Sequence, residues 1–252
     1  AEAYWNKSLA LLLAGELKQG WELFEWRFKA EKTGLKARDL PAPLWLGEQD
    51  IAGKTLLIHP EQGLGDTIQF CRYAKLAKER GARVVMCVPK ALMQLLIGLE
   101  GVDELVEQGQ VLPHFDYHCP MLSLPLAFKT ELSTIPSATA YLAAQAGKCE
   151  AWSRRLGDKT RLRVGLVWSG STTFKNDHNR SVRLQEVLAH LPEDCEYVSL
   201  QKEVRAEDRP VLAGSGIRHF GEDLRDFTDT AALCDLMDLV IAVDTSVVHL
   251  AG

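Results

Sequence analysis

Hydrophobic side chains near the start of the chain recur with a helical period. Across residues 5–28 they return every three or four positions, with a break near Gly15 and Glu16, so we expect two short helices in a hairpin. The apolar positions are Leu9, Leu12, Leu13, Leu17, Trp21, Phe24 and Phe28. A lone pair of short helices cannot bury such a face, and we therefore expect it to pack on the following domain or on further helices of a repeat array.

Beyond Pro41 and Pro43, which mark an extended connector, short apolar runs alternate with helical patterns. Strands are expected at 55–59, 83–88, 104–107 and 115–119, and helices at 66–80 and 91–99. This alternation predicts a parallel sheet. The rest of the proline-punctuated stretch 113–136 is expected to be loop.

The alternation restarts after a polar segment at residues 152–159. Strands are expected at 163–168, 197–201, 217–220 and 239–243, and helices at 182–190 and 228–237. Two such units predict a pair of Rossmann-type α/β domains that face each other across a cleft, with ligands at the carboxyl ends of the strands. The expected parts are a hairpin and connector at 1–50, a first α/β domain at 51–158 and a second at 159–252. Because the last residues only begin a helix, we expect the second domain to be incomplete.

Composition and charge exclude several classes of partner. The 252 residues are 46% hydrophobic and 25% charged, which favours a soluble globular protein. A net charge of -5 without a block of Lys or Arg argues against nucleic acid, and no apolar run approaches the roughly 20 residues that a transmembrane helix needs. Six cysteines occur singly and no secretion signal is visible, so we expect a cytoplasmic protein.

Residues 61–67 read EQGLGDT and join the first expected strand to the first expected helix. Glycines allow the backbone of this turn to approach a ligand, and the start of the helix supplies unpaired N–H groups. Asp66 is either an ordinary helix cap or a functional carboxylate. A dinucleotide fingerprint is excluded because Ile68 stands where a third glycine is needed, and a phosphate loop before Gly53 is excluded because Glu48 occupies its leading glycine position.

Two polar turns follow strands of the second half. Trp168, Ser169 and Gly170 lead into a loop with Lys175, Arg180 and Ser181. Small residues and cations suit a diphosphate, although a solvated loop also explains them. Residues 243–249 read VDTSVVH; their backbone N–H groups could hold phosphate while Asp244 takes a sugar hydroxyl, or they could be a capped helix with His249 in the core.

His114, Asp116 and His118 alternate, which would place them on one face of a strand beside Cys119. No further ligand is spaced to complete a metal shell, so we interpret them as ordinary polar or core residues. The chain contains no Asp-x-Asp pair. Glycosyl transfer that relies on a divalent metal commonly shows such carboxylates, and any transfer here is therefore expected to use cations and dipoles instead, with no metal and no cofactor.

Two of these turns resemble those of bacterial heptosyltransferases, glycosyltransferase family nine. The likeness rests on Gly65 and Asp66, and on residues 244–250, which read DTSVVHL. The hairpin resembles the final unit of a tetratricopeptide array, with WNKSLA at 5–10 and GWE at 20–22 standing where repeat signatures would. The whole arrangement is similar to bacterial proteins that fuse such repeats to a glycosyltransferase domain.

The resemblance implies a GT-B fold, with the acceptor bound by the first α/β domain and a nucleotide sugar by the second. Asp66 would be the general base that takes a proton from the acceptor hydroxyl, and transfer would invert the anomeric centre. On the acceptor side it implies Gln62, Gly63, Gly65 and Gln69. On the donor side it implies Trp168, Ser169, Gly170, Lys175, Arg180, Gln201, Asp244, Thr245, Ser246 and His249.

Two donor-side residues depart from the family pattern. Arg180 matches the family's phosphate-binding lysine only in charge, and Ser246 replaces a glycine. The substituted lysine and the repeat unit favour a donor other than ADP-heptose. The repeat unit also favours a protein acceptor, although a glycan acceptor stays open. The predicted function is metal-independent, inverting transfer from a nucleotide-diphosphate sugar to a hydroxyl. The alternatives are a non-catalytic, repeat-linked binding module with a GT-B shell and a sugar-nucleotide epimerase of related architecture.

Overall fold

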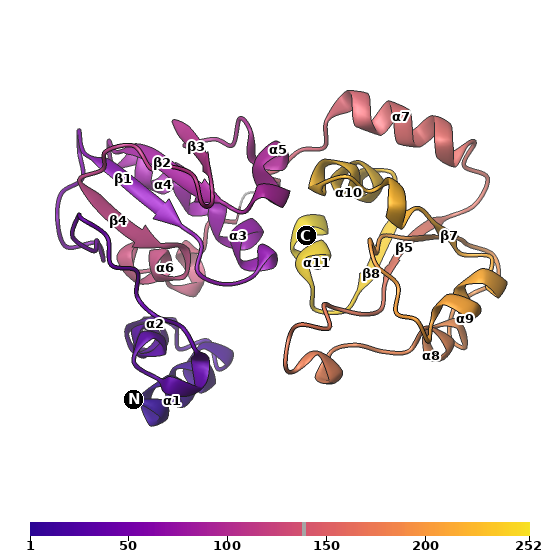
Figure 1. The fold of residues 1–252 in the computed structure, drawn as a ribbon, viewed down its shortest axis with the longest axis horizontal. Helices are drawn as coiled ribbons and strands as arrows, with labels where there is room; N and C mark the ends of the chain where they lie inside the picture. Colours follow the sequence, from indigo (N-terminus) through magenta and orange to yellow (C-terminus); the bar gives the residue numbers. More distant parts are fainter. Residues whose placement is uncertain (138–139) are drawn as a thin grey trace. The chain divides into compact units, whose positions relative to one another are not determined.

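The chain forms two α/β units, each built on a four-stranded parallel sheet (Figure 1). A computed structural model describes residues 1–137 and 140–252 of the protein. The first unit is Ala1–Tyr141 and the second is Leu142–Gly252. Every strand pairing in the two sheets is parallel, and this confirms the expected fold class of two Rossmann-type domains preceded by a helical hairpin.

The first sheet has the strand order β3-β2-β1-β4. Its strands are β1 (Thr55–His59), β2 (Arg83–Val88), β3 (Glu104–Glu107) and β4 (Tyr117–Pro120), and the first three have the bounds expected from the sequence. The helices of this unit after the hairpin are α3 (Leu64–Phe70), α4 (Ala74–Glu79), α5 (Met93–Leu96) and α6 (Leu124–Ala127), with 3-10 turns η3 (Cys71–Tyr73), η4 (Lys90–Leu92), η5 (Met121–Ser123) and η6 (Leu132–Thr134). The single helix expected at 66–80 is thus two helices joined by a 3-10 turn. Helix α6 lies where a loop was expected, because Pro125 in its first turn is compatible with a helix start.

One face of the first sheet is covered by extended chain. Leu57, Val85, Cys87, Val106 and Phe115 form an apolar cluster on this face, and the residues packed against it are Leu40, Ala42 and Leu112. The connector also extends the sheet at β4, where the backbone N–H of Trp45 donates to the His118 carbonyl at 2.8 Å. Residues 34–45 are therefore an integral cover of the first unit.

The expected hairpin is present as α1 (Glu2–Leu13) and α2 (Leu17–Phe24), followed by the 3-10 turns η1 (Glu25–Phe28) and η2 (Glu31–Thr33). Phe24 is buried and contacts the rings of Trp5 and Trp21. Trp21 in turn packs edge-on against Phe70 of α3, with the ring centroids 6.1 Å apart. Leu13 remains 91% exposed, so the hairpin packs on the α/β part through α2 while part of α1 faces solvent.

Arg27 is wholly buried and joins the hairpin to the sheet. Its Nε and Nη2 donate to the two carboxylate oxygens of Glu61 at 2.9–3.2 Å, and Nη2 also donates to Ser123 Oγ at 2.7 Å. Its Nη1 donates to Glu25 at 2.7 Å. Burial raises the pKa of Glu61, and the charge of Arg27 opposes that rise. The guanidinium therefore holds together the hairpin, the chain after β1 and the start of α6.

We expect Arg27→Met to destabilise the first unit. The substitution leaves the largely buried Glu61 and the half-buried Glu25 without their cation, and breaking a buried ion pair costs about 3–5 kcal/mol. Urea denaturation followed by tryptophan fluorescence measures this loss. The matched control is Lys75→Met, because Lys75 and Glu100 form an exposed pair whose removal costs about 0–1 kcal/mol. Equal losses in the two variants would contradict the anchoring role of Arg27.

The second sheet has the strand order β7-β6-β5-β8. Its strands are β5 (Arg163–Val167), β6 (Glu196–Ser199), β7 (Arg218–His219) and β8 (Leu239–Ala242). The helices are α7 (Ala146–Leu156), α8 (Leu184–Leu188), α9 (Arg209–Gly214), α10 (Phe227–Asp235) and α11 (Ser246–Ala251), with 3-10 turns η7 (Asp177–Asn179) and η8 (Gly221–Asp223). Helices α7 and α9 were not expected from the sequence.

Helices cover both faces of the second sheet (Figure 1). Val167 of β5 packs with Trp152 of α7 and Leu233 of α10, whereas Leu166 packs on the opposite face with Leu184 of α8. This alternation follows from the two-residue period of a strand. Across residues 1–137 and 140–252, no helix combines the length and apolarity that a membrane span requires.

Candidate functional site

The turn after β1 places Asp66 in the first turn of α3. One carboxylate oxygen of Asp66 accepts a hydrogen bond from the Gly63 backbone N–H at 2.8 Å, and the side chain is half-buried. Asp66 therefore does cap the helix, and the same bond fixes the orientation of a carboxylate at the carboxyl end of β1. The other expected acceptor-side positions surround it: Gln62, Gly63 and Gln69 are exposed and Gly65 is half-buried. The role of Asp66 as a base stays a prediction.

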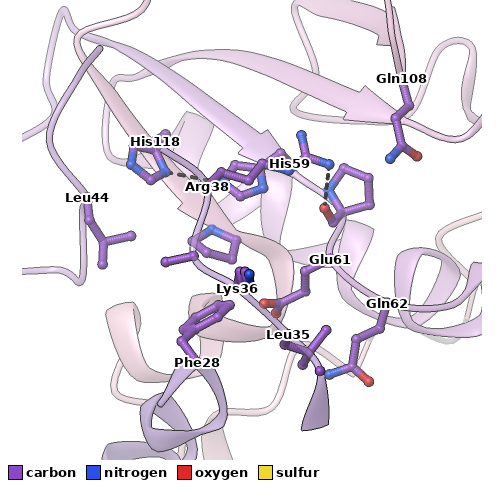
Figure 2. A pocket seen from close by; sticks show the side chains of 14 residues that line it. Phe28, Leu35, Lys36, Arg38, Leu44, His59, Glu61, Gln62, Gln108 and His118 are labelled. Atoms are coloured by element: carbon purple, nitrogen blue, oxygen red, sulfur yellow. Dashed lines mark hydrogen bonds between the residues drawn. The ribbon is translucent and has the colours of Figure 1, made fainter. Parts of the chain in front are cut away.

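A pocket of about 310 Å³ opens beside this turn (Figure 2). Residues of the connector at 34–38 line one side, and the ends of β1 and β4 contribute His59 and His118. The two imidazoles share a face of the sheet because Leu57 pairs with His118 and His59 lies two residues further along β1. Glu61 and Gln62 also line the pocket, so it is continuous with the turn that carries Asp66.

The two histidines form a buried, neutral pair. His59 Nε2 and His118 Nδ1 are 3.2 Å apart, and one ring donates to the other. Burial lowers the pKa of His59 to about 3, and the Arg38 guanidinium above it adds to the effect. Burial and Arg38 lower the pKa of His118 as well. His59 Nδ1 is buried and has no hydrogen-bond partner within the described part of the chain.

The alternating residues 114–118 serve different ends of the sheet. Asp116 accepts from the Thr55 backbone N–H at 2.7 Å at the start of β1, whereas His118 faces His59 further along. Within residues 1–137 and 140–252, no three His, Cys, Asp or Glu side chains are grouped so as to hold a metal ion. His118 is a buried polar residue, as the sequence suggested, but its partner His59 lies 59 positions away and could not be found by local pattern.

We expect the stability of the first unit to fall as the pH drops from about 6.5 toward 3. Unfolded histidine takes up a proton near pH 6.5, whereas folded His59 does so only near pH 3, so protons favour the unfolded chain in this window. At pH 5 the loss from this one group is about 2 kcal/mol relative to pH 7.5.

In His59→Asn that part of the pH dependence should disappear, as measured by urea denaturation at the two pH values. The exposed His190→Asn is the matched control and should retain the wild-type slope. A His59→Asn slope equal to that of the wild type would show that His59 is protonated in the folded chain.

Gln201 fixes the polar turn at the end of β5. Its Oε1 accepts from the backbone N–H groups of Trp168 and Ser169 at 2.7 and 2.9 Å, and its Nε2 donates to Ser169 Oγ and to the Glu203 carbonyl. Trp168 is buried and its Nε1 donates to Asp208 at 2.9 Å. In this structure, Gln201 and Trp168 thus hold the turn in place.

Asp177 organises the loop that follows Gly170. It accepts hydrogen bonds from Ser181, Arg180 and Arg205. Burial raises the pKa of the Asp177 carboxyl, but these three donors outweigh burial and hold the pKa below its ordinary value. A Cβ atom at Gly170 would lie 2.4 Å from Asp177 Oδ1 and 2.6 Å from Arg180 Nη2, so only glycine allows this approach.

Arg180 links the two polar turns of the second unit. Its Nη1 donates to the Asp244 carbonyl at 2.8 Å, which joins the loop after β5 to the turn after the neighbouring strand β8. His249 Nε2 lies 3.7 Å from Asp244 Oδ1, and Thr245 Oγ1 is buried without a hydrogen-bond partner in the described chain.

The donor-side residues expected from the sequence thus fall into three groups. Arg180 and the residues at 168–170 and 244–249 lie at the adjacent ends of β5 and β8, and Gln201 supports them from the end of β6. Lys175 is exposed in the loop, and no described hydrogen bond or ion pair connects it to the others. The sequence did not indicate Asp177, Arg205 and Asp208. The bonds from Arg205 to Asp177 and from Trp168 to Asp208 join residues 28 and 40 positions apart, so no local pattern relates them.

No family model matches the chain. The chain is similar to the protein FlbA of Caulobacter vibrioides, with 28% identity over 275 aligned positions that cover 98% of this chain and 45% of FlbA. The chain therefore spans less than half the length of that curated relative.

Solved structures of similar fold are glycosyltransferases. The glycosyl transferase family 9 protein of Veillonella parvula matches with a TM-score of 0.62 and 12% identity, covering 81% of this chain and 79% of that one. The chain has the fold of family 9 glycosyltransferases. The ADP-heptose LPS heptosyltransferase II of E. coli has a TM-score of 0.53 and 13% identity over 78% of this chain and 81% of that chain. The iron-containing heptosyltransferase TibC, solved with ADP-D-β-D-heptose, has a TM-score of 0.55 and 11% identity over 81% of this chain and 57% of its own.

Proposed function

We propose that the protein is an inverting, metal-independent glycosyltransferase that moves a sugar from a nucleotide-diphosphate donor to an acceptor hydroxyl. The observation that carries the proposal is the bond from Arg180 to the Asp244 carbonyl, which sets a guanidinium between the polar turns at the ends of β5 and β8. Ligands of open α/β sheets bind at this edge. A family 9 fold with a cation at that edge supports a donor of this class.

The proposed donor site uses charge to stabilise the leaving group. As the bond from the anomeric carbon to the diphosphate breaks, negative charge develops on the leaving oxygen, and a nearby guanidinium lowers the free energy of that state. Arg180 carries this role, and Asp177 with Arg205 keeps it in position. We assign the donor-side contacts to residues 168–170, Lys175, and Asp244, Thr245, Ser246 and His249.

On the acceptor side, Asp66 takes the proton from the acceptor hydroxyl. The freed oxygen attacks the anomeric carbon from the face opposite the diphosphate, so the configuration inverts and a nucleoside diphosphate leaves. The bond from the Gly63 N–H supports this role because a base must be held in a fixed direction to act on one hydroxyl. Gln62, Gly63, Gly65 and Gln69 surround the acceptor in this proposal.

We assign acceptor recognition to the hairpin and connector at 1–50, acceptor binding to the rest of the first unit up to Tyr141, and donor binding to the second unit, Leu142–Gly252. A tetratricopeptide-like hairpin and the exposed Leu13 on α1 favour a protein acceptor over a free glycan, because stacked helical repeats commonly bind polypeptide.

All six cysteines are free thiols, which supports the proposal that the protein acts in the reducing cytoplasm.

We expect Arg180→Met to weaken binding of the preferred nucleoside diphosphate by about 10- to 100-fold, because one charge-assisted contact to phosphate contributes about 1.5–3 kcal/mol. Isothermal titration with ADP, GDP and UDP first identifies the preferred base and then compares the variants. Arg161→Met is the matched control, since Arg161 is exposed and donates to the Glu193 carbonyl at 3.2 Å. Wild-type affinity in Arg180→Met would place the donor phosphate elsewhere.

We expect Asp66→Asn to lower kcat by about 10²–10⁴-fold while nucleotide binding is unchanged, because the amide can still accept from Gly63 but cannot take a proton. Single-turnover sugar transfer and nucleotide titration measure the two quantities. Asp50→Asn, at an exposed turn where Asp50 accepts from Ala52, is the control and should keep full activity. If Asp66→Asn transfers sugar at the wild-type rate, Asp66 only caps α3. If the wild type and the Asp66→Asn variant both bind nucleotide and neither transfers sugar, the chain is the non-catalytic binding module.

A further inference from the structure

We propose that the pocket between the connector and the ends of β1 and β4 binds a small, hydroxylated carboxylic acid. Assigning this acid to the acceptor rests on the proposed function, whereas its binding does not. Figure 2 shows the pocket, with Arg38 lying across the imidazoles of His59 and His118 in this view and Lys36 nearer Glu61 and Phe28. The connector supplies the cationic wall, and the sheet supplies a neutral floor.

The cations of this pocket have no acidic partner. Arg38 donates to the Pro60 carbonyl at 3.2 Å, and neither Arg38 nor Lys36 forms an ion pair with any carboxylate in residues 1–137 and 140–252. Glu61 is the acidic residue of the lining, and its carboxylate is already bonded on both oxygens by Arg27. An incoming anion therefore meets two unneutralised cations.

The local charge favours one negative charge on the ligand. Three cations, Arg27, Lys36 and Arg38, stand against two carboxylates, Glu25 and Glu61, which leaves a net charge of +1 when all five are ionised. A carboxylate neutralises this charge. A phosphate dianion would exceed it beside the two acids, and a neutral sugar would leave it unmatched.

The remaining lining fits the body of a hydroxylated molecule. His59 Nδ1 is a buried polar atom with no hydrogen-bond partner among the described residues, and a ligand hydroxyl can act as donor or acceptor toward it whichever tautomer is present. The amides of Gln62 and Gln108 add donors and acceptors, and Phe28 offers an apolar wall. A volume of about 310 Å³ accommodates a single monosaccharide or a capped amino acid.

The pocket connects to the proposed chemistry through the chain after β1. Gln62 lines the pocket and lies four residues before Asp66, and Arg27 holds the adjacent Glu61 in place. A carboxylate held by Arg38 and Lys36 would therefore anchor an acceptor beside the Gly63 turn. In this way the pocket selects acceptors that carry an acid near the hydroxyl to be modified.

Direct binding tests the pocket without any transfer reaction. Glucuronate and N-acetylaspartate amide represent a sugar acid and an acidic side chain, with glucose and glucose 6-phosphate as neutral and dianionic comparisons. We expect one of the two carboxylates to bind at least about tenfold more tightly than both comparisons and to shift the imidazole NMR signals of His59 and His118. The carboxylate that binds more tightly shows whether the pocket takes a sugar acid or an acidic amino-acid side chain. Equal affinity for glucose, tighter binding of glucose 6-phosphate or unmoved imidazole signals would overturn the proposal.

Variants of the connector complete the test. Arg38→Met and the exposed Lys36→Met should each weaken carboxylate binding by about tenfold, and Lys54→Met, an exposed lysine outside the pocket, should not. Because Lys36 is exposed, its variant is expected to fold even if Arg38→Met is less stable. Retained affinity in the Lys36 and Arg38 variants would sink the proposal.

The pocket and the transferase proposal fail separately. Arg180→Met, in the second unit, should bind the carboxylate as the wild type does. If the wild type and the variants bind the carboxylate but none of them transfers sugar, the pocket proposal stands and the transferase proposal fails. If the wild type transfers sugar but binds neither carboxylate, the transferase proposal stands and the pocket proposal fails.

Discussion

A single buried guanidinium, that of Arg27, determines how the first unit is put together. It bonds Glu25 within the hairpin, Glu61 after β1 and Ser123 before α6, three segments that lie far apart in the chain. A charge in this position is tolerated only because every contact is made, and the loss of one member leaves the others desolvated and unpaired. The helical hairpin is therefore part of the α/β unit.

In the second unit, too, buried polar side chains hold separate segments of the chain in place. Gln201, Asp177 and Asp208 are buried polar side chains. Gln201 bonds the backbone of the turn after β5, Asp208 bonds the indole N–H of Trp168 in that turn, and Asp177 bonds Arg205. Packing of apolar side chains forms the sheets, but it does not specify the direction of a loop. Hydrogen bonds from residues below the surface do so, because each fixes both a distance and an angle.

Most strands of the two sheets could be predicted from the sequence, but the candidate functional site could be predicted only in part. Strands β1 and β2 have the expected bounds because their apolar runs are continuous and buried after the first residue. Strand β3 has the expected bounds as well, although Val106 is the one buried residue of its four. Helix α7 was missed because it is mostly polar: only Trp152 and Leu156 are buried, and the position of Trp152 depends on Asp229, which is 77 residues away. The Asp66 and Asp244 turns could be found from local glycine and polar patterns. Arg27 with Glu61, and His59 with His118, could not, since no local period relates residues 34 and 59 positions apart.

In the connector at 34–45, the residues that face the pocket are separate from the helices and strands that form the fold. Lys36 and Arg38 belong to neither a helix nor a strand, and the connector reaches the sheet mainly through apolar side chains and backbone bonds near Trp45. A substitution of the exposed Lys36 can thus change the charge presented to a ligand at little cost to folding. Divergent relatives could in this way exchange one preferred small molecule for another while the strands beneath stay the same.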